Sequence, residues 1–106
     1  MKDEGKIFYV IYADFEEKYG LTSHAMKIYD RALKDISDQD VKFQIFNLYL
    51  AKTAKHYGVT HSRQLFERSF QMLDGKYLIQ IGLRFAKMER KLGEIERARN
   101  IYEHLS

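Results

Sequence analysis

The sequence predicts an all-α protein, an α-α superhelix of about three helix-turn-helix repeats and six helices. The 106 residues include no proline and only six glycines, so little in the chain interrupts a helix. Apolar residues recur at steps of three and four, the period of an amphipathic helix. Aromatic residues recur at separations of 37 and 36 residues, and a fixed period of this size is typical of stacked two-helix units.

The first repeat is expected over residues 6–37, after a polar stretch, residues 1–5, that is expected to be disordered or vector-derived. Its first helix begins at Lys6, and Gly20 is expected to end it in the left-handed conformation. Thr22 or Ser23 is a candidate N-cap of the second helix, because a short hydroxyl side chain can accept from the first free backbone amides.

The second repeat is expected over residues 38–74 and the third over residues 75–106. The polar break at 37–40 holds capping residues, and Gly58 is expected to end the third helix. Thr60 is a candidate cap of the fourth helix. Asp74 and Gly75 predict the next turn. The last two helices are joined at Gly93.

Superposing the three repeats gives the candidate core. Each repeat has one aromatic residue in its first helix and one in its second, with a small residue four positions before the latter. Such pairs allow close helix packing, and stacking buries the faces that one hairpin cannot bury alone. Gly58 is displaced by one residue from the frame, which predicts a longer first helix or turn in the middle repeat. The predicted core residues are Tyr12, Ala25, Tyr29, Tyr49, Phe66, Phe85, Ala98 and Tyr102.

The composition indicates no catalytic chemistry. The chain has no cysteine, so it has no thiolate metal site or cysteine nucleophile. His56 and His61 lie five residues apart with no third ligand near them in sequence, which disfavours a metal site. Phosphate-binding loops and nucleophile elbows are absent from the sequence. We therefore expect no enzyme activity, no catalytic residue, no cofactor and no metal, and, without a long apolar run, no membrane partner.

Basic residues gather near the last turn of the sequence. They allow two interpretations: a contact with RNA or an acidic partner, or a surface neutralised by Glu89, Glu94 and Glu96, which the mixed charges favour. Aromatic residues at helical spacing are likewise expected in the core rather than stacked on bases. The basic residues are Lys87, Arg90, Lys91, Arg97 and Arg99.

The second helices read AMKIYDRA, SRQLFERS and ARNIYEHL, and longer tracts read YGVTHSRQLFERS and LRFAKMERKLGEIERARNIY. These resemble the HAT (half-a-TPR) repeat, and most closely that of the Syf-type pre-mRNA-splicing factors, which are XPA-binding-protein-like and related to the Crooked-neck factors. The resemblance covers nearly all of residues 7–104. It implies a C-terminal-region fragment of a longer solenoid, acting in the nucleus as a non-catalytic scaffold for other spliceosomal proteins.

The family has a glutamate in the first helix and an arginine in the second, and only the third repeat keeps both. The resemblance therefore implies an intra-repeat ion pair between Glu89 and Arg99. The family's proline after the second helix is absent. In the three repeats the glutamate position holds Glu16, Thr53 and Glu89, and the arginine position holds Met26, Arg63 and Arg99.

Two other functions stay open at this point: direct RNA binding through the basic residues, and a TPR-type peptide-binding module outside RNA processing. A TPR unit runs to about 34 residues with a different signature, which disfavours the second. Because the two ends of a stack expose apolar surface, we also expect the chain to self-associate through its solenoid ends.

Overall fold

The computed structural model describes residues 2–106, with side chains from residue 5 onward. This part of the chain forms six α-helices and one short 3₁₀-helix and contains no strand, which confirms the predicted all-α fold of six helices. The elements are α1 (Lys2–Tyr19), α2 (Thr22–Asp35), α3 (Gln39–Tyr57), η1 (Val59–Ser62), α4 (Arg63–Met72), α5 (Gly75–Lys91) and α6 (Ile95–Leu105).

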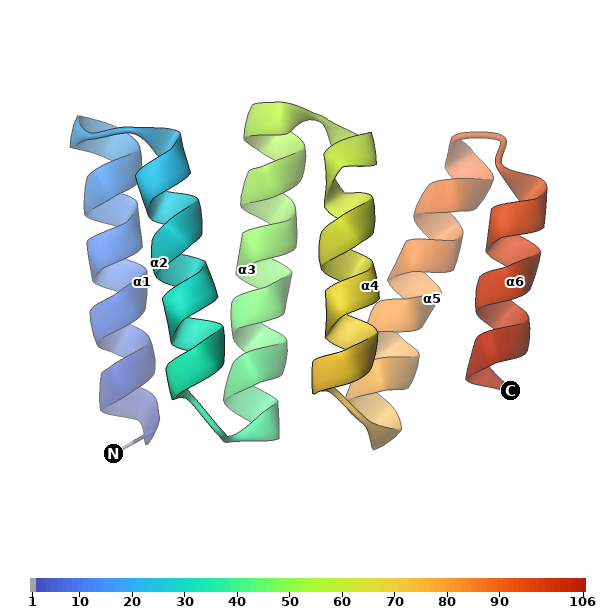
Figure 1. Cartoon of the computed structure of the whole chain (residues 1–106), viewed down its shortest axis with the longest axis horizontal. Helices are drawn as coiled ribbons and strands as arrows, with labels where there is room; N and C mark the ends of the chain where they lie inside the picture. The colour runs from blue at the N-terminus through green and yellow to red at the C-terminus, as the bar shows by residue number, and fades with distance from the viewer. Residues whose placement is uncertain (1) are drawn as a thin grey trace.

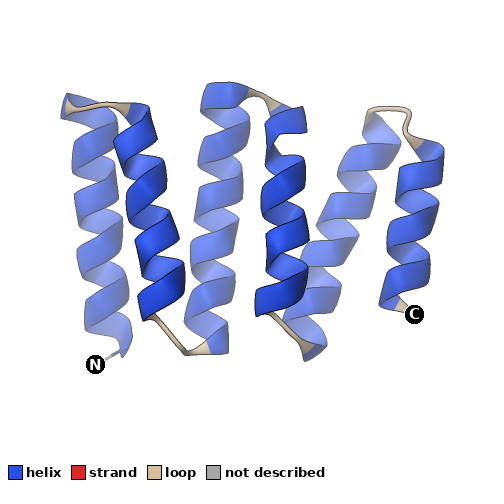
Figure 2. Ribbon diagram, viewed as in Figure 1, coloured by secondary structure: helices blue, strands red, loops and turns tan. Residues whose placement is uncertain are grey.

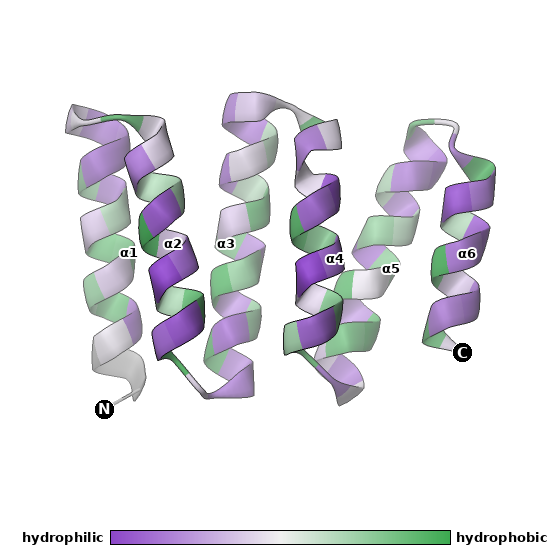
Figure 3. Cartoon of the chain, viewed as in Figure 1, coloured by the Kyte–Doolittle hydropathy of each residue, from purple (hydrophilic) through white to green (hydrophobic). Residues whose placement is uncertain are grey.

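The helices form three hairpins that stand side by side in one row (Figures 1 and 2). Helices α1, α3 and α5 make one layer, and α2, α4 and α6 make the other, whose near face is largely hydrophilic in α2 and α4 (Figure 3). The row measures 39 × 28 × 14 Å, and the chain termini lie at its opposite ends. Each hairpin therefore contacts only its neighbours, as in a solenoid.

Several helix ends follow from local sequence. The side chain of Asp38 accepts a hydrogen bond from the Val41 amide at 3.2 Å and caps α3. Gly58, Gly75 and Gly93 have positive φ angles of 101°, 55° and 80°. Residues that carry a Cβ atom rarely adopt this backbone conformation. The polar break and the glycine turns therefore act as the sequence predicts.

Other ends differ from the predictions. Gly20 does not have a positive φ; its amide continues the helical pattern by donating to the Glu16 carbonyl at 2.9 Å. The N-cap of α2 is Leu21, in extended conformation and without a side-chain cap, so Thr22 and Ser23 lie inside the helix. Helix α1 begins at Lys2 rather than at Lys6, so residues 2–5 are helical; Met1 lies outside the described residues.

The middle repeat accommodates its extra residue in η1. After Gly58, the chain makes one 3₁₀ turn before α4 begins at Arg63. Thr60 lies within this turn and therefore does not cap α4, whose N-cap is Ser62. Helix α3 has 19 residues against 18 in α1 and 17 in α5, so the middle repeat has both a longer first helix and a longer turn, the two forms that the sequence allowed.

The core runs along the row between the two layers. Its largest fully buried apolar side chains are Tyr29, Phe46, Leu33, Ile45 and Ile81. Six of the eight predicted core residues are buried: Ala25, Tyr29, Tyr49, Phe66, Phe85 and Ala98.

Tyr12 and Tyr102 differ from the other predicted core residues, being 39% and 40% exposed. They lie in α1 and α6, the helices at the two ends of the row (Figure 1). At the two inner joints, the aromatic residues at these two repeat positions cover each other across adjacent repeats, and the described residues supply no further helix on the outer side of α1 or α6.

Stacked aromatic rings join successive repeats. Tyr29 of α2 stacks on Tyr49 of α3 with ring centroids 5.5 Å apart, and Phe66 of α4 stacks on Phe85 of α5 at 4.7 Å with an interplanar angle of 1°. Burial raises the pKa of both tyrosines to about 12, so their phenols stay neutral. Each joint thus links the second helix of one repeat to the first helix of the next.

We predict that Phe66→Ala lowers the free energy of unfolding by about 3–5 kcal/mol, because it opens a cavity opposite Phe85. Tyr102→Ala, the same truncation at the equivalent position of α6, should cost only about 1 kcal/mol, since that residue is already partly exposed. Urea denaturation followed by circular dichroism measures both. Equal losses would show that the inter-repeat joint does not carry the stability assigned to it.

Candidate functional site

An ion pair between a buried glutamate and a partly exposed arginine links the second and third repeats. Glu89 of α5 is 0% exposed. Its carboxylate accepts from Arg63 of α4: Nε lies 2.9 Å from Oε2 and 3.2 Å from Oε1, and Nη2 lies 2.8 Å from Oε1. These hydrogen bonds raise the pKa of the Arg63 guanidinium. The glutamate is thus desolvated and fully paired at the same time.

The expected pairing of Glu89 with Arg99 is therefore corrected to a pairing with Arg63. Arg99 instead forms an exposed pair with Glu96, three residues before it on α6. The family's glutamate and arginine positions face each other between repeats, not within one. One signal in the sequence could have indicated this pairing: the arginine position of the first repeat and the glutamate position of the second both depart from the family pattern, and these two positions face each other.

Those two departures are Met26 and Thr53, at the joint between the first and second repeats. Both are buried, and the Thr53 hydroxyl donates to the Met26 sulfur at 3.7 Å. A neutral pair thus occupies the position that Arg63 and Glu89 occupy one repeat later. Since both partners are replaced together, neither joint leaves a buried charge unpaired.

Further polar contacts link neighbouring helices within each layer. In one layer, Arg68 of α4 pairs with Asp30 of α2 at 2.9 Å. In the other layer, the carboxylate of Glu17 in α1 pairs with the ammonium group of Lys52 in α3 at 2.7 Å and also pairs with His56. The hydrogen bonds from His56 and then Lys52 lower the pKa of Glu17 to about 2. The repeat spacing in the sequence gave no indication of either group of contacts.

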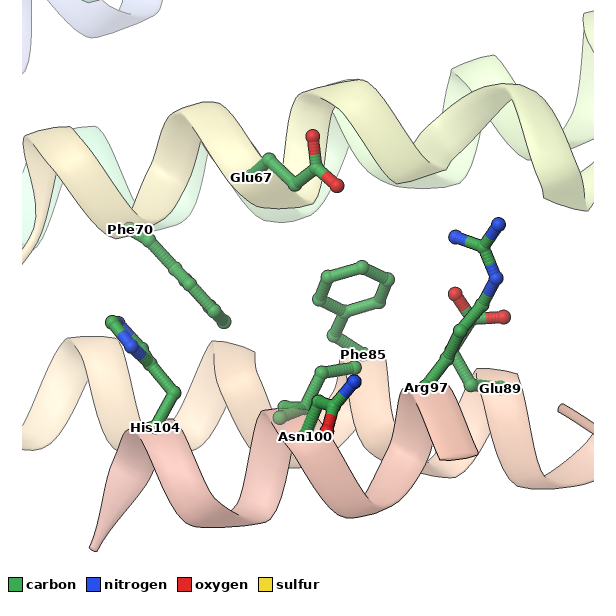
Figure 4. Close-up of a pocket in the computed structure, with 8 residues that line it drawn as sticks. Glu67, Phe70, Phe85, Glu89, Arg97, Asn100 and His104 are labelled. Atoms are coloured by element: carbon green, nitrogen blue, oxygen red, sulfur yellow. The ribbon is translucent and has the colours of Figure 1, made fainter. Parts of the chain in front are cut away.

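A pocket of about 310 Å³ lies between α4, α5 and α6 (Figure 4). The ring of Phe70 from α4 stacks on His104 from α6 with centroids 5.3 Å apart. Glu67 and Arg97 bring opposite charges to its walls, so its lining favours no one class of ligand. Arg97, part of the predicted basic group, belongs to this pocket.

The described residues form no group of three or more His, Cys, Asp or Glu side chains placed to hold a metal ion. Three histidines have other contacts: His24 lies 3.9 Å from Glu16, His56 pairs with Glu17, and His61 lies against the ring of Tyr57. No helix among the described residues has the length and apolar character needed to span a membrane.

The structure divides the predicted basic group. The glutamates expected to neutralise it have other partners or reach only part of it: Glu94 lies 3.9 Å from Arg97, and Glu96 pairs with Arg99. Glu89 is occupied by Arg63. Self-neutralisation therefore holds for Arg97 and Arg99 only. Three exposed cations of α5 are left outside these pairs: Lys87, Arg90 and Lys91.

Lys87 and Lys91 line a second groove, of about 430 Å³, beside η1 and the end of α5. Arg90, although exposed, does not line it. We call this surface the basic groove; its lining residues are Val59, Arg84, Lys87, Met88, Lys91 and Leu92.

Two-helix units of 36 and 37 residues, joined from the second helix of one to the first helix of the next, define a HAT-type helical-repeat protein. The family whose model matches residues 2–106 is described as the pre-mRNA-splicing factor Syf1/CRNKL1 C-terminal HAT repeat, and the chain belongs to this family. The resemblance inferred from the sequence is thereby confirmed.

Proteins similar to this chain over nearly its whole length are also named as Syf1 pre-mRNA-splicing factors. The chain is 44% identical over 101 residues to pre-mRNA-splicing factor SYF1 of Dictyostelium discoideum and 42% identical over 101 residues to SYF1 of Homo sapiens. It is 38% identical over 104 residues to the syf1 homolog of Drosophila melanogaster. The matches cover 95%, 95% and 98% of this chain and 12% of each relative, so the chain spans about an eighth of their length.

The neutral pair of the first joint supplies a test of the charged pair in the second. Of the two single variants and the double variant, Arg63→Met should lower the thermal unfolding midpoint most, because it leaves Glu89 buried without a cation. Adding Glu89→Thr should recover most of that loss, since it reproduces the Met26–Thr53 pair. A double variant no more stable than Arg63→Met would contradict the assigned pairing; circular dichroism melts of all four proteins complete the cycle.

Glu17 predicts a pH-dependent contribution to stability. Its pKa is about 2 in the folded chain against its usual 4.5, so its contribution is complete above pH 4.5 and is lost as the pH falls toward 2. Wild type should therefore exceed Glu17→Gln in unfolding free energy above pH 4.5, and the difference should vanish near pH 2. Glu103→Gln, which removes an exposed carboxylate of α6, is the control; a pH-independent difference for Glu17→Gln would exclude the linkage.

Proposed function

We propose that the chain serves, as part of a longer protein, as a non-catalytic protein–protein interaction scaffold in pre-mRNA splicing. The observation that carries this proposal is the family match over residues 2–106, together with relatives named pre-mRNA-splicing factors. The corresponding site of action is the nucleus, and the corresponding partners are other spliceosomal proteins. The proposed role requires no catalytic residue or cofactor.

The architecture supports a role based on shape. The row is 39 Å long and 14 Å thick, so it presents much surface for its size. Its hairpins are tied by the Arg63–Glu89 and Arg68–Asp30 pairs, which fix how each repeat lies on the next. Solenoids of this kind offer extended surfaces to partners through their curvature.

Direct RNA binding is a second candidate, favoured by one observation. Lys87, Arg90 and Lys91 lie outside the ion pairs that neutralise Arg97 and Arg99. RNA binding through them predicts an affinity that falls steeply with salt, because cations released from phosphates drive such binding. The third candidate, a TPR-type peptide module outside RNA processing, is disfavoured by the family match.

The end faces of the row also support self-association of the chain. Glu16 and Tyr12 on α1 occupy the repeat positions of Glu89 and Phe85, and Arg99 on α6 occupies that of Arg63. Helix α6 of one copy can thus dock on α1 of a second copy as α4 docks on α5. Exposed apolar residues of α1 would be covered by this contact: Ile7, Phe8, Ile11 and Phe15.

Light scattering tests the self-association. The mass of the chain should rise with concentration, Arg99→Glu should suppress the rise, and Arg99→Glu combined with Glu16→Arg should restore it. A monomer at every concentration, or a charge exchange without recovery, would exclude this end-to-end contact.

Partner identification tests the scaffold function. The full-length protein and a version lacking these 106 residues are purified from cells, and the associated proteins are identified by mass spectrometry. Splicing proteins should accompany the intact protein, and a subset of them should be lost with the deletion at equal protein abundance. If no splicing proteins are recovered with the intact protein, the proposed function is wrong.

A further inference from the structure

We propose that the basic groove is a docking site for an acidic protein segment that carries an apolar anchor side chain. This inference goes beyond the scaffold function, because it names a surface and the chemistry of its partner. It does not depend on whether the full-length protein acts in splicing.

The groove combines a row of cations with an apolar wall. Arg84, Lys87 and Lys91 are spaced by three and four residues, so they lie along one face of α5 over two turns. Val59 of η1 and Leu92 after α5 line the same groove while 44% and 41% exposed. A volume of about 430 Å³ accommodates side chains of a bound segment.

The cations of the groove are not matched by acids. None of the described residues that line the groove carries a carboxylate. Arg84 donates to the neutral side chain of Asn47, which leaves its charge uncompensated. The nearest glutamate in sequence, Glu89, is buried and paired with Arg63. The groove therefore has the electrostatic character that attracts an acidic partner.

Stabilisation of the helix dipole accounts for only part of this charge. Lys91 is the last residue of α5, where a cation interacts favourably with the free carbonyl groups. That effect is confined to the last turn, and Arg84 lies two turns earlier. It also gives no reason for two exposed aliphatic residues beside the cations.

The apolar lining favours a protein segment over RNA. None of the residues that line the groove is aromatic, so it offers no ring on which a base could stack. The side chains of Val59 and Leu92 offer no hydrogen-bond partner to a ribose or a base. An acidic segment with a leucine or similar anchor uses both features, its carboxylates on the cations and its anchor on the aliphatic side chains.

A titration followed by amide NMR tests the proposal. The probe is a peptide of about a dozen residues with glutamates flanking two leucines, a length suited to one groove. Its binding should shift the amides of residues 59 and 84–92 and should weaken as salt rises. Two control peptides, one with serine in place of leucine and one with glutamine in place of glutamate, should each bind at least about tenfold more weakly than the original peptide.

Variants of the chain locate the binding. Lys87→Glu combined with Lys91→Glu, and separately Val59→Ser, should each weaken binding of the peptide by about tenfold or more. Lys27→Glu combined with Lys34→Glu makes the same charge change on exposed residues of α2 and should leave the affinity unchanged. Circular dichroism melts confirm that every variant is folded.

Three results would overturn the proposal. They are no binding of the acidic peptide at low salt, binding that shifts amides elsewhere, and equal weakening by the α2 control. Oligouridine of similar length is titrated in parallel, and RNA binding in the groove without peptide binding would assign it to RNA instead. None of these results bears on splicing, since only the isolated chain is measured.

Discussion

The structure depends on the burial of the Glu89 carboxylate between two repeats. A fully buried carboxylate is tolerated only with a cation and hydrogen bonds in good geometry, and Arg63 supplies both. A shift of α5 along α4 by one turn would separate the two groups and would also unstack Phe66 from Phe85. The ion pair and the ring stack thus fix one register between the hairpins, and the row of helices follows from that register.

The first joint shows that the packing geometry does not itself require charge. Met26 and Thr53 fill the same position with a neutral pair, and Tyr29 stacks on Tyr49 there as Phe66 does on Phe85. The two joints are nevertheless not interchangeable, because Glu89 facing Met26 would be buried without a partner. The difference between the neutral first joint and the charged second joint therefore distinguishes one order of hairpins from another.

The use of Glu89 in the joint also determines the character of the surface. With this carboxylate directed into the core toward Arg63, the outer face of α5 keeps its cations, and the basic groove lies on that face. Arg97 and Arg99, one helix later, are matched by glutamates of their own helix. The stability of the solenoid and the charge available to a partner thus arise from the same choice of ion pair.

The sequence by itself determined the six helices, the repeat period, the capping residues at 37–40, a longer first helix or turn in the middle repeat, and the family, because these depend on local conformation or on spacing along the chain. The tertiary structure alone decided which residues face each other across a joint. A period does not say whether Glu89 meets an arginine of its own repeat or of the preceding one, and Tyr12 and Tyr102 fit the core pattern yet lie exposed at the ends of the row. The free cations of α5 could likewise be recognised only once each glutamate had its partner in space.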